Sequence, residues 1–304
     1  MNDKTFNSKP SEFKTDFTLV NKSSPQTPSV IARLGGSQGP CVFSFGPISS
    51  ALDQAWELSG AGLFPPFSSL ICLSQSAGRG RMGRSWLSNP GNVYAAVKLD
   101  PKGPFAGLSA GLNLAAILAQ ELDELIIKKE GPKLNCQGPL VMIKWPNDLI
   151  YQGRKVGGIL LENRKGELIA GVGLNLIAPP PDALSREPWA PPAGAINSDL
   201  GSAEDLWPLL AYKILISYNE YFASYGENKS LIGKANILSR LLGLGQMAEV
   251  HGPSCSPSVK IPRLFGRITG LTEEGALIME GPDGPLTVWS GVLVLSMRNF
   301  QLHD

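Results

Sequence analysis

The stretches Gly78-Arg79-Gly80-Arg81-Met82-Gly83-Arg84-Ser85-Trp86 and Lys144-Trp145-Pro146-Asn147-Asp148 say most about the fold and function of this chain. The first, here called the Gly/Arg loop (residues 78–86), combines the backbone freedom of glycine with the fork-shaped hydrogen-bond donors of arginine. The second places a lysine at the end of an expected strand, in a turn that a proline stiffens and a tryptophan anchors by burial. Together they predict a site that brings two anions close together, such as a carboxylate and the phosphates of a nucleotide.

The sequence around these stretches predicts a mixed α/β domain (α+β) followed by a small β-barrel. Hydrophobic periodicity indicates helices at 51–58, 108–129, 202–225 and 229–242, and strands at 70–74, 93–99, 141–144, 149–151, 156–161 and 167–176. Because several consecutive strands are joined by short turns, we expect a mixed sheet flanked by helices and no strict βαβ series. After residue 243, short strands separated by turn signals predict the barrel.

Three domains follow from this pattern. Residues 1–39 are polar and predict a flexible tail, with a short strand at about 17–20. Residues 40–243 form the main domain, and residues 244–304 form the barrel. Within the main domain, the proline-rich segment 178–195 has no room for a regular element and predicts an ordered surface loop or lid.

The composition excludes several classes of function. A net charge of +1 over 304 residues argues against a protein that coats nucleic acid. The two histidines, His251 and His303, lie near no cysteine or carboxylate cluster, so neither a histidine-based zinc site nor a Ser-His-Asp triad is expected, and we predict no metal-ligating residues. The four cysteines form no C-x-x-C pair and predict free thiols in a reducing compartment. With no signal peptide or membrane-length apolar run, we expect a cytoplasmic protein that does not contact membranes.

Each motif by itself has an ordinary structural explanation. A Gly/Arg run is also typical of a solvated loop or an RNA-contacting segment, and this one is neither a Walker loop nor a dinucleotide fingerprint. An isolated lysine at a strand end usually points into solvent. The small residues that follow, at 157–158 and at 171 and 173, favour a site because paired glycines on an apolar strand indicate that something lies flat against the backbone.

With these motifs in place, the chain resembles the biotin protein ligase family over about residues 41–297. The family's Gly-Arg-Gly-Arg-x-Gly-Arg-x-Trp loop is matched by residues 78–86, and its Lys-Trp-Pro-Asn-Asp signature by residues 144–148. Its Ser-Pro-x-Gly-Asn-x-Tyr segment is matched loosely by residues 88–94. Its Lys-x-x-Gly-Ile-Leu and Gly-x-Gly-x-Asn strands are matched by residues 155–160 and 171–175.

The resemblance implies a class II aminoacyl-tRNA synthetase/biotin ligase-like catalytic domain with an SH3-like barrel after it. It implies that biotin and Mg-ATP give biotinyl-5'-adenylate, which a lysine of a biotin carboxyl carrier protein domain then attacks. The expected cofactors and substrates are ATP, Mg²⁺ and biotin. The polar segment before residue 40 is too short for the family's winged helix, so we expect the monofunctional type, without DNA binding. Such folds also form edge-strand homodimers, so the resemblance leaves a homodimer open as an alternative to a monomer.

The resemblance also assigns roles to individual residues. Lys144 would neutralise charge beside the reacting carboxylate and α-phosphate, and Arg79 and Arg81 would close over the carboxylate and the acyl-adenylate. These three are the expected catalytic residues. The expected substrate-binding residues are Ser50, Ala51, Leu52, Gln75, Gly78, Gly80, Arg84, Trp86, Asn92, Tyr94, Trp145, Asn147, Asp148, Lys155, Gly157, Gly158, Asn175 and Trp189.

Four of these residues have specific expected contacts. Gln75 would hydrogen-bond the polar ring of biotin, and Trp86 would pack near the biotin tail. Asn175 would help to position the nucleotide. Trp189 would either stack on adenine or anchor the proline-rich loop to the surface.

Two departures from the family pattern bear on the substrate. Ser50-Ala51-Leu52 stands where the family usually has Ser-Thr-Asn, and Val292 stands where it often has an acidic residue. Losing the threonine and asparagine could leave polar groups of biotin unpaired, at about 1–3 kcal/mol each. A ligase for another carboxylic acid is therefore one alternative, and lipoate ligases are the nearest relatives of that kind. A non-catalytic binder of biotin or its adenylate is a second, which Arg81 and Lys144 argue against, and a nucleic-acid binder is a third.

Overall fold

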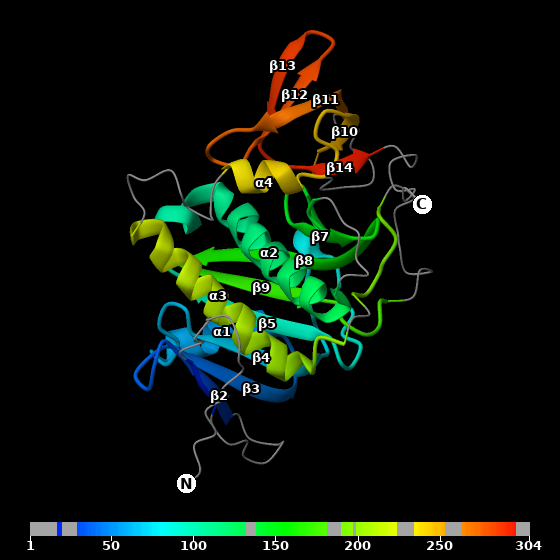
Figure 1. Cartoon of the computed structure of the whole chain (residues 1–304). Helices are drawn as coiled ribbons and strands as arrows, with labels where there is room; N and C mark the ends of the chain where they lie inside the picture. Colours follow the sequence, from blue (N-terminus) through cyan, green and yellow to red (C-terminus); the bar gives the residue numbers. More distant parts are fainter. Residues whose placement is uncertain are drawn as a thin grey trace.

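A computed structural model describes residues 17–19, 29–131, 138–180, 190–196, 199–223, 234–252 and 263–295 (Figure 1). The main part is built on a nine-stranded sheet in the order β1-β2-β3-β4-β5-β9-β8-β7-β6. Strands β3 and β4 run parallel and the other neighbouring pairs are antiparallel, which confirms the predicted mixed sheet. The strands are β1 Phe17–Leu19, β2 Ser29–Leu34, β3 Cys41–Ile48, β4 Ser69–Gln75, β5 Val93–Leu99, β6 Val141–Lys144, β7 Asp148–Tyr151, β8 Arg154–Arg164 and β9 Glu167–Leu174.

Helices cover both faces of this sheet. Helices α2 (Ala110–Glu130) and α3 (Ala203–Ala223) lie side by side across one face, and α1 (Ala51–Gly60) packs on the other, against β4, β5 and β9 (Figure 1). Short 3-10 turns lie at η1 (Arg81–Gly83), η2 (Gly103–Phe105) and η3 (Gly107–Ser109). Ser50 caps α1 because its hydroxyl accepts the amide of Asp53.

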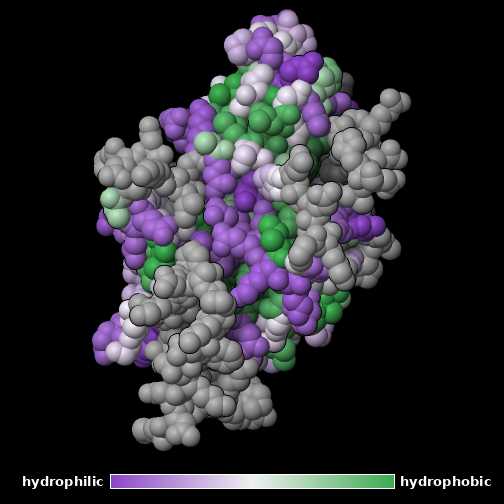
Figure 2. Space-filling view, viewed as in Figure 1, coloured by the Kyte–Doolittle hydropathy of each residue, from purple (hydrophilic) through white to green (hydrophobic). Residues whose placement is uncertain are grey.

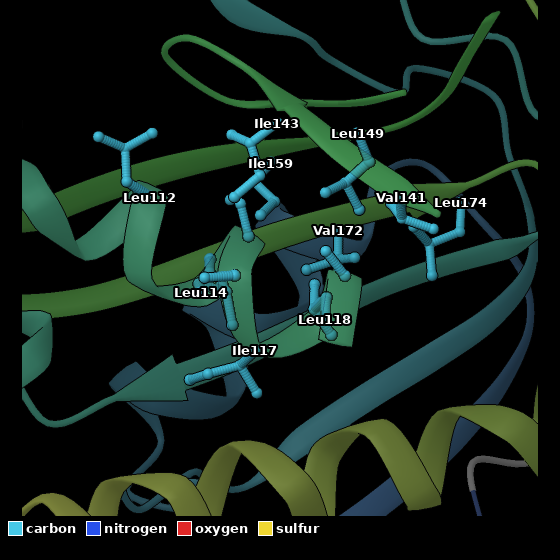
Figure 3. Packing of buried hydrophobic residues seen from close by; sticks show 14 of the residues in the cluster. Leu112, Leu114, Ile117, Leu118, Val141, Ile143, Leu149, Ile159, Val172 and Leu174 are labelled. Carbon is cyan, nitrogen blue, oxygen red and sulfur yellow. The ribbon is translucent and has the colours of Figure 1, made fainter. Parts of the chain in front are cut away.

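The larger hydrophobic core fills the α2/α3 side of the sheet. Leucines of α2, among them Leu114 and Leu118, pack against Ile159 and Val172 of β8 and β9 (Figure 3). A smaller cluster lies on the other side, between α1 and the sheet, and contains Leu52 among its buried residues. Since successive residues of a strand point to opposite faces, the neighbours of Ile159 and Val172 point to the α1 side. Three of those four neighbours, Gly158, Gly171 and Gly173, are glycines, which leaves room there.

The C-terminal part is a five-stranded antiparallel sheet in the order β13-β12-β11-β10-β14, which confirms the small β unit predicted there. Its strands are β10 Met247–His251, β11 Arg263–Leu271, β12 Leu277–Gly281, β13 Gly284–Val288 and β14 Val292–Leu295, and α4 (Lys234–Arg240) precedes them. On the face shown in Figure 2, hydrophobic residues gather on this sheet. The two sheets are joined where Trp145 Nε1 donates to the carbonyl of Gly275 at 3.0 Å.

The structure corrects the predicted N-terminal boundary. Strand β2 (Ser29–Leu34) pairs with β3, so these residues belong to the main sheet and the prediction of a flexible tail over 1–39 is wrong for them. The short strand expected near 17–20 is confirmed as β1. The other residues before β2 lie outside the described part of the chain. Among the described helices, none is long and apolar enough to cross a membrane.

The contact between Trp145 and Gly275 gives a test of how the two sheets are coupled. We expect Trp145→Phe to lower the free energy of unfolding by about 1–3 kcal/mol, because the carbonyl of Gly275 then loses its hydrogen-bond donor. The side chain of Trp145 is buried, so water cannot easily replace that donor. Urea denaturation followed by far-UV circular dichroism measures this change. The matched control is Trp289→Phe at a side chain that is 53% exposed. Equal stability of the two variants would contradict the coupling.

Candidate active site

A cavity of about 680 Å³ opens on the α1 side of the large sheet. Its floor is the backbone of β8 and β9, where Gly158 pairs with Gly173 and Leu160 with Gly171. Its walls come from the start of α1, the Gly/Arg loop, the turn between β6 and β7, and residues 291–293 of the C-terminal sheet. Segments far apart in sequence therefore meet over this floor. The cavity is deep there because the glycines of β8 and β9 have no side chain to fill it.

The Gly/Arg loop is folded into a closed hairpin over this cavity. The amide of Trp86 donates to Gly78 O at 2.8 Å, and the amide of Gly80 donates to Arg84 O at 2.7 Å. Met82 and Gly83 make the tip with φ of 58° and 71°. A β-carbon on Gly78 would lie 2.6 Å from the carbonyl oxygen of Trp86, so the close approach of the two stem strands requires this glycine.

The indole of Trp86 lies flat on the floor of the cavity. A β-carbon added to Gly173 would lie 2.5 Å from its ring, and one added to Gly158 would lie 3.2 Å away. The ammonium of Lys155 sits 5.6 Å from the ring centroid, within range of a cation–π interaction. The indole Nε1 is buried and has no hydrogen-bond partner among the described residues. The loop thus seals part of the floor at the cost of one unsatisfied donor.

The other end of the cavity is cationic. Lys144 is 4% exposed and lies opposite Asp148 in the pairing of β6 with β7. Lys155 pairs with Asp148 at 2.7 Å. The side chain of Arg81 reaches from the loop to the turn between β6 and β7, where it donates to Asn147 Oδ1 at 3.1 Å. Burial lowers the pKa of Arg81 from the ordinary value. Such a cluster of donors in a partly buried site suits a carboxylate next to a phosphate.

The chain is similar to proteins of known activity. Residues 69–176 match the model of the Biotin/lipoate A/B protein ligase family. The chain is 31% identical over 248 residues to a biotin--[acetyl-CoA-carboxylase] ligase of Paracoccus denitrificans, covering 78% of this chain and 91% of that protein. The chain belongs to the biotin protein ligase family.

Two further relatives agree. A bifunctional ligase/repressor BirA of Bacillus subtilis is 27% identical over 258 residues, covering 82% of this chain and 72% of that protein. The solved structure of a biotin protein ligase from Aquifex aeolicus in complex with biotin and ATP superposes with a TM-score of 0.61 at 24% identity. That match covers 84% of this chain and 98% of the Aquifex chain, and it shows that the two share a fold.

Most of the residues expected from the ligase family line the cavity. They are Ser50, Ala51, Leu52, Gln75, Arg79, Gly80, Arg81, Arg84, Trp86, Lys144, Trp145, Asn147, Asp148, Lys155, Gly158 and Asn175. Asn175 is 3% exposed and donates to Gly194 O at 3.0 Å, which ties β9 to the described end of the proline-rich loop. Trp189 lies outside the described residues.

Four expected ligase residues are not among the cavity-lining residues: Gly78, Asn92, Tyr94 and Gly157. Asn92 Oδ1 accepts the amides of residues 176–178, and the hydroxyl of Tyr94 donates to Asn89 O. Gly157 faces Leu174 on the α2 side, where a β-carbon would lie 2.6 Å from that leucine. These residues shape the strands and the turn behind the cavity.

The end of the cavity beside α1 departs from the family pattern as the sequence indicated. Leu52 packs on Gly171, where a β-carbon would lie 2.9 Å from the leucine side chain. Gln75 Oε1 accepts the amide of Ala51 at 2.8 Å, and Gln75 Nε2 donates to Ser88 Oγ at 3.2 Å. Both ends of the amide expected to bind the biotin ring are therefore engaged with the protein itself.

Arg79 makes contacts that the sequence did not anticipate. Its guanidinium binds both carboxylate oxygens of Asp53 on α1, at 2.6 and 2.8 Å, and reaches Glu162 on β8 at 3.2 Å. These hydrogen bonds lower the pKa of Asp53 and raise that of Arg79 from their ordinary values. Asp53 and Glu162 were not expected from the sequence, because they have no role in any motif and meet the loop only in the folded chain. Val292 was noted only as a departure from the family pattern, and the fold places residues 291–293 at the cavity wall.

Proposed function

We propose that this protein activates biotin with ATP as biotinyl-5'-adenylate and transfers the acyl group to a lysine of the biotin carrier domain of acetyl-CoA carboxylase. In the first step a carboxylate oxygen of biotin attacks the α-phosphorus and pyrophosphate leaves. In the second, the lysine amine attacks the acyl carbon and AMP leaves. The similarity to the biotin--[acetyl-CoA-carboxylase] ligase of Paracoccus denitrificans supports this assignment.

The observation that carries the proposal is the arrangement of Arg81 and Lys144 above a glycine floor. A carboxylate and a triphosphate repel each other, and a buried lysine and a half-buried arginine at one end of the cavity offset that repulsion as charge develops during in-line displacement. Trp86 and the hairpin cover the floor, so an acyl-adenylate bound there would be shielded from water.

Mg²⁺ would enter with ATP. The described residues contain no group of three side chains that could hold a metal ion. Mg²⁺ at nucleotide sites is commonly bound by one or two carboxylates and the substrate phosphates, and Asp148 is the carboxylate that lines this cavity. When bound, the ion supplies charge neutralisation on the phosphates. Homodimer formation, the absence of DNA binding and a cytoplasmic location stay predictions.

A related ligase for a less polar acid is the second candidate, and Leu52 favours it. Its side chain covers Gly171 and makes the α1 end of the cavity apolar. An acid with an apolar tail loses nothing at such a wall, whereas a polar ring must find its partners elsewhere.

Pyrophosphate release from Mg-ATP, with biotin, lipoate and octanoate compared side by side, tests the proposal. We expect release with biotin and transfer of label to a carrier domain. Release with only another of the acids would replace biotin as substrate and keep the mechanism. No release with any of them, from protein with a normal circular dichroism spectrum, would contradict ligase activity.

A further inference from the structure

We propose that Arg79 is a positioning residue, which fastens the Gly/Arg loop to α1 and β8 and leaves Arg81 to meet the substrate. This inference rests on the proposed function only for its consequence in catalysis, because the contacts themselves are properties of the fold. It changes the role expected for Arg79, which the sequence placed over the substrate carboxylate.

The contacts of Arg79 are those of a structural clamp. Its guanidinium makes a bidentate pair with Asp53 and a further hydrogen bond to Glu162. Arg79 and Arg164 together face the two carboxylates of Asp53 and Glu162, so the cluster has no positive charge left over to attract another anion. A substrate carboxylate would have to displace the bidentate partner of Arg79, so Arg79 in this position does not bind it.

The acceptors are themselves held in place. Glu162 Oε2 accepts from Trp56 Nε1 at 2.8 Å and from Arg164 Nη2 at 2.7 Å, which leaves Oε1 for Arg79. The guanidinium of Arg164 also stacks 4.6 Å from the ring of Trp56. Asp53 sits in the first turn of α1, next to the Ser50 cap. The clamp thus joins the Gly/Arg loop to two segments, α1 and β8, whose carboxylates are held by other contacts. Because the acceptors are already oriented, less conformational entropy is lost when Arg79 pairs with them.

Clamping Arg79 fixes the stem of the hairpin. Arg79 pairs with Ser85 across the stem, and the next residues of the loop are Gly80 and Arg81. With the stem held, Arg81 reaches Asn147 and the indole of Trp86 stays on the floor. The unsatisfied Nε1 of Trp86 favours opening, so the closed loop needs an opposing attachment, and the Arg79 clamp provides it.

The test removes the carboxylate charges and leaves the loop sequence unchanged. In Asp53→Asn/Glu162→Gln, we expect trypsin to cleave the folded, substrate-free protein after residues 79, 81 and 84 about tenfold faster than in the parent. The matched control is Glu57→Gln, which removes one exposed charge from the same helix at a residue that bonds Gln54. It should leave the cleavage rate unchanged.

A second readout separates positioning from general stability. We expect the double variant to release about tenfold more adenylate into solution per carrier labelled, while its thermal midpoint stays close to that of Glu57→Gln. The single variant Arg79→Lys should keep the loop closed only in part, because an ammonium cannot bind two carboxylates in a fork.

Parental cleavage rates in the double variant would overturn the proposal. So would faster cleavage throughout the chain with a lowered thermal midpoint, which would indicate a general loss of stability. The trypsin experiment needs no substrate. Faster loop cleavage in a protein that releases no pyrophosphate would therefore support the clamp and contradict the proposed ligase activity, so the two failures are distinguishable.

Discussion

Replacing Lys144 with alanine is expected to reduce adenylate formation by about 100-fold to 1,000-fold, the usual cost of removing one preorganised group that stabilises transition-state charge. Lys144 is 4% exposed and lies opposite Asp148 in the β6–β7 pair, at the cationic end of the cavity. In such a site its interaction with developing phosphate charge is screened little by water. Biotin-dependent pyrophosphate release under single-turnover conditions measures the loss.

Two companion variants make this result specific. Lys144→Arg keeps the positive charge with a different shape, and we expect it to retain more activity than the alanine variant. Lys102→Ala removes a lysine whose side chain is 74% exposed, away from the cavity, and should behave like the parent. If Lys144→Ala formed adenylate at the parental rate while folded, the role assigned to Lys144 would be wrong.

Replacing Gly173 with valine is expected to reduce activity by about a hundredfold, because displacement of the loop moves groups that must be held to within about an ångström. The first carbon of the new side chain would lie 2.5 Å from the indole of Trp86, so the ring must leave the floor. The neighbouring backbone belongs to β9 between β5 and β8, which gives the side chain nowhere else to go. The Michaelis constant for the acid and the single-turnover rate should both worsen.

The control for this prediction is Gly270→Val, at a strand position in β11 where an added β-carbon meets nothing within 4 Å. It should leave both kinetic constants unchanged. Gly173→Ala should lie between the two, since a smaller side chain displaces the ring less. Parental kinetics in Gly173→Val would show that the substrate does not use this floor and that the position of Trp86 is unimportant.

The secondary structure could be predicted from sequence where local patterns were strong. Strands β5 and β6 have the predicted bounds, because short apolar runs between turn residues specify a strand without help from the rest of the chain. Strand β2 was missed. It lies between polar and glycine-rich segments, and its place becomes clear only when β3 lies next to it.

The candidate site was predictable to the extent that its residues lie in motifs. Residues 78–86 and 144–148 were singled out for their chemistry, and the fold brings both to one cavity. The direction in which each side chain points was not predictable. Asn92 and Tyr94 lie within a segment that matches the family, but they hydrogen-bond backbone groups of residues 176 and 89 and do not line the cavity.

The sequence by itself determined the family, the mixed sheet with a C-terminal β unit, and the residue types that could bind a carboxylate and a phosphate. These depend on local periodicity and on motifs whose residues are close together in the chain. Only the tertiary structure decided that Arg79 is clamped by Asp53, 26 residues away, and Glu162, 83 residues away. The physical reason is that a charge pairs with whatever the fold brings within a few ångströms, and no local pattern encodes that distance.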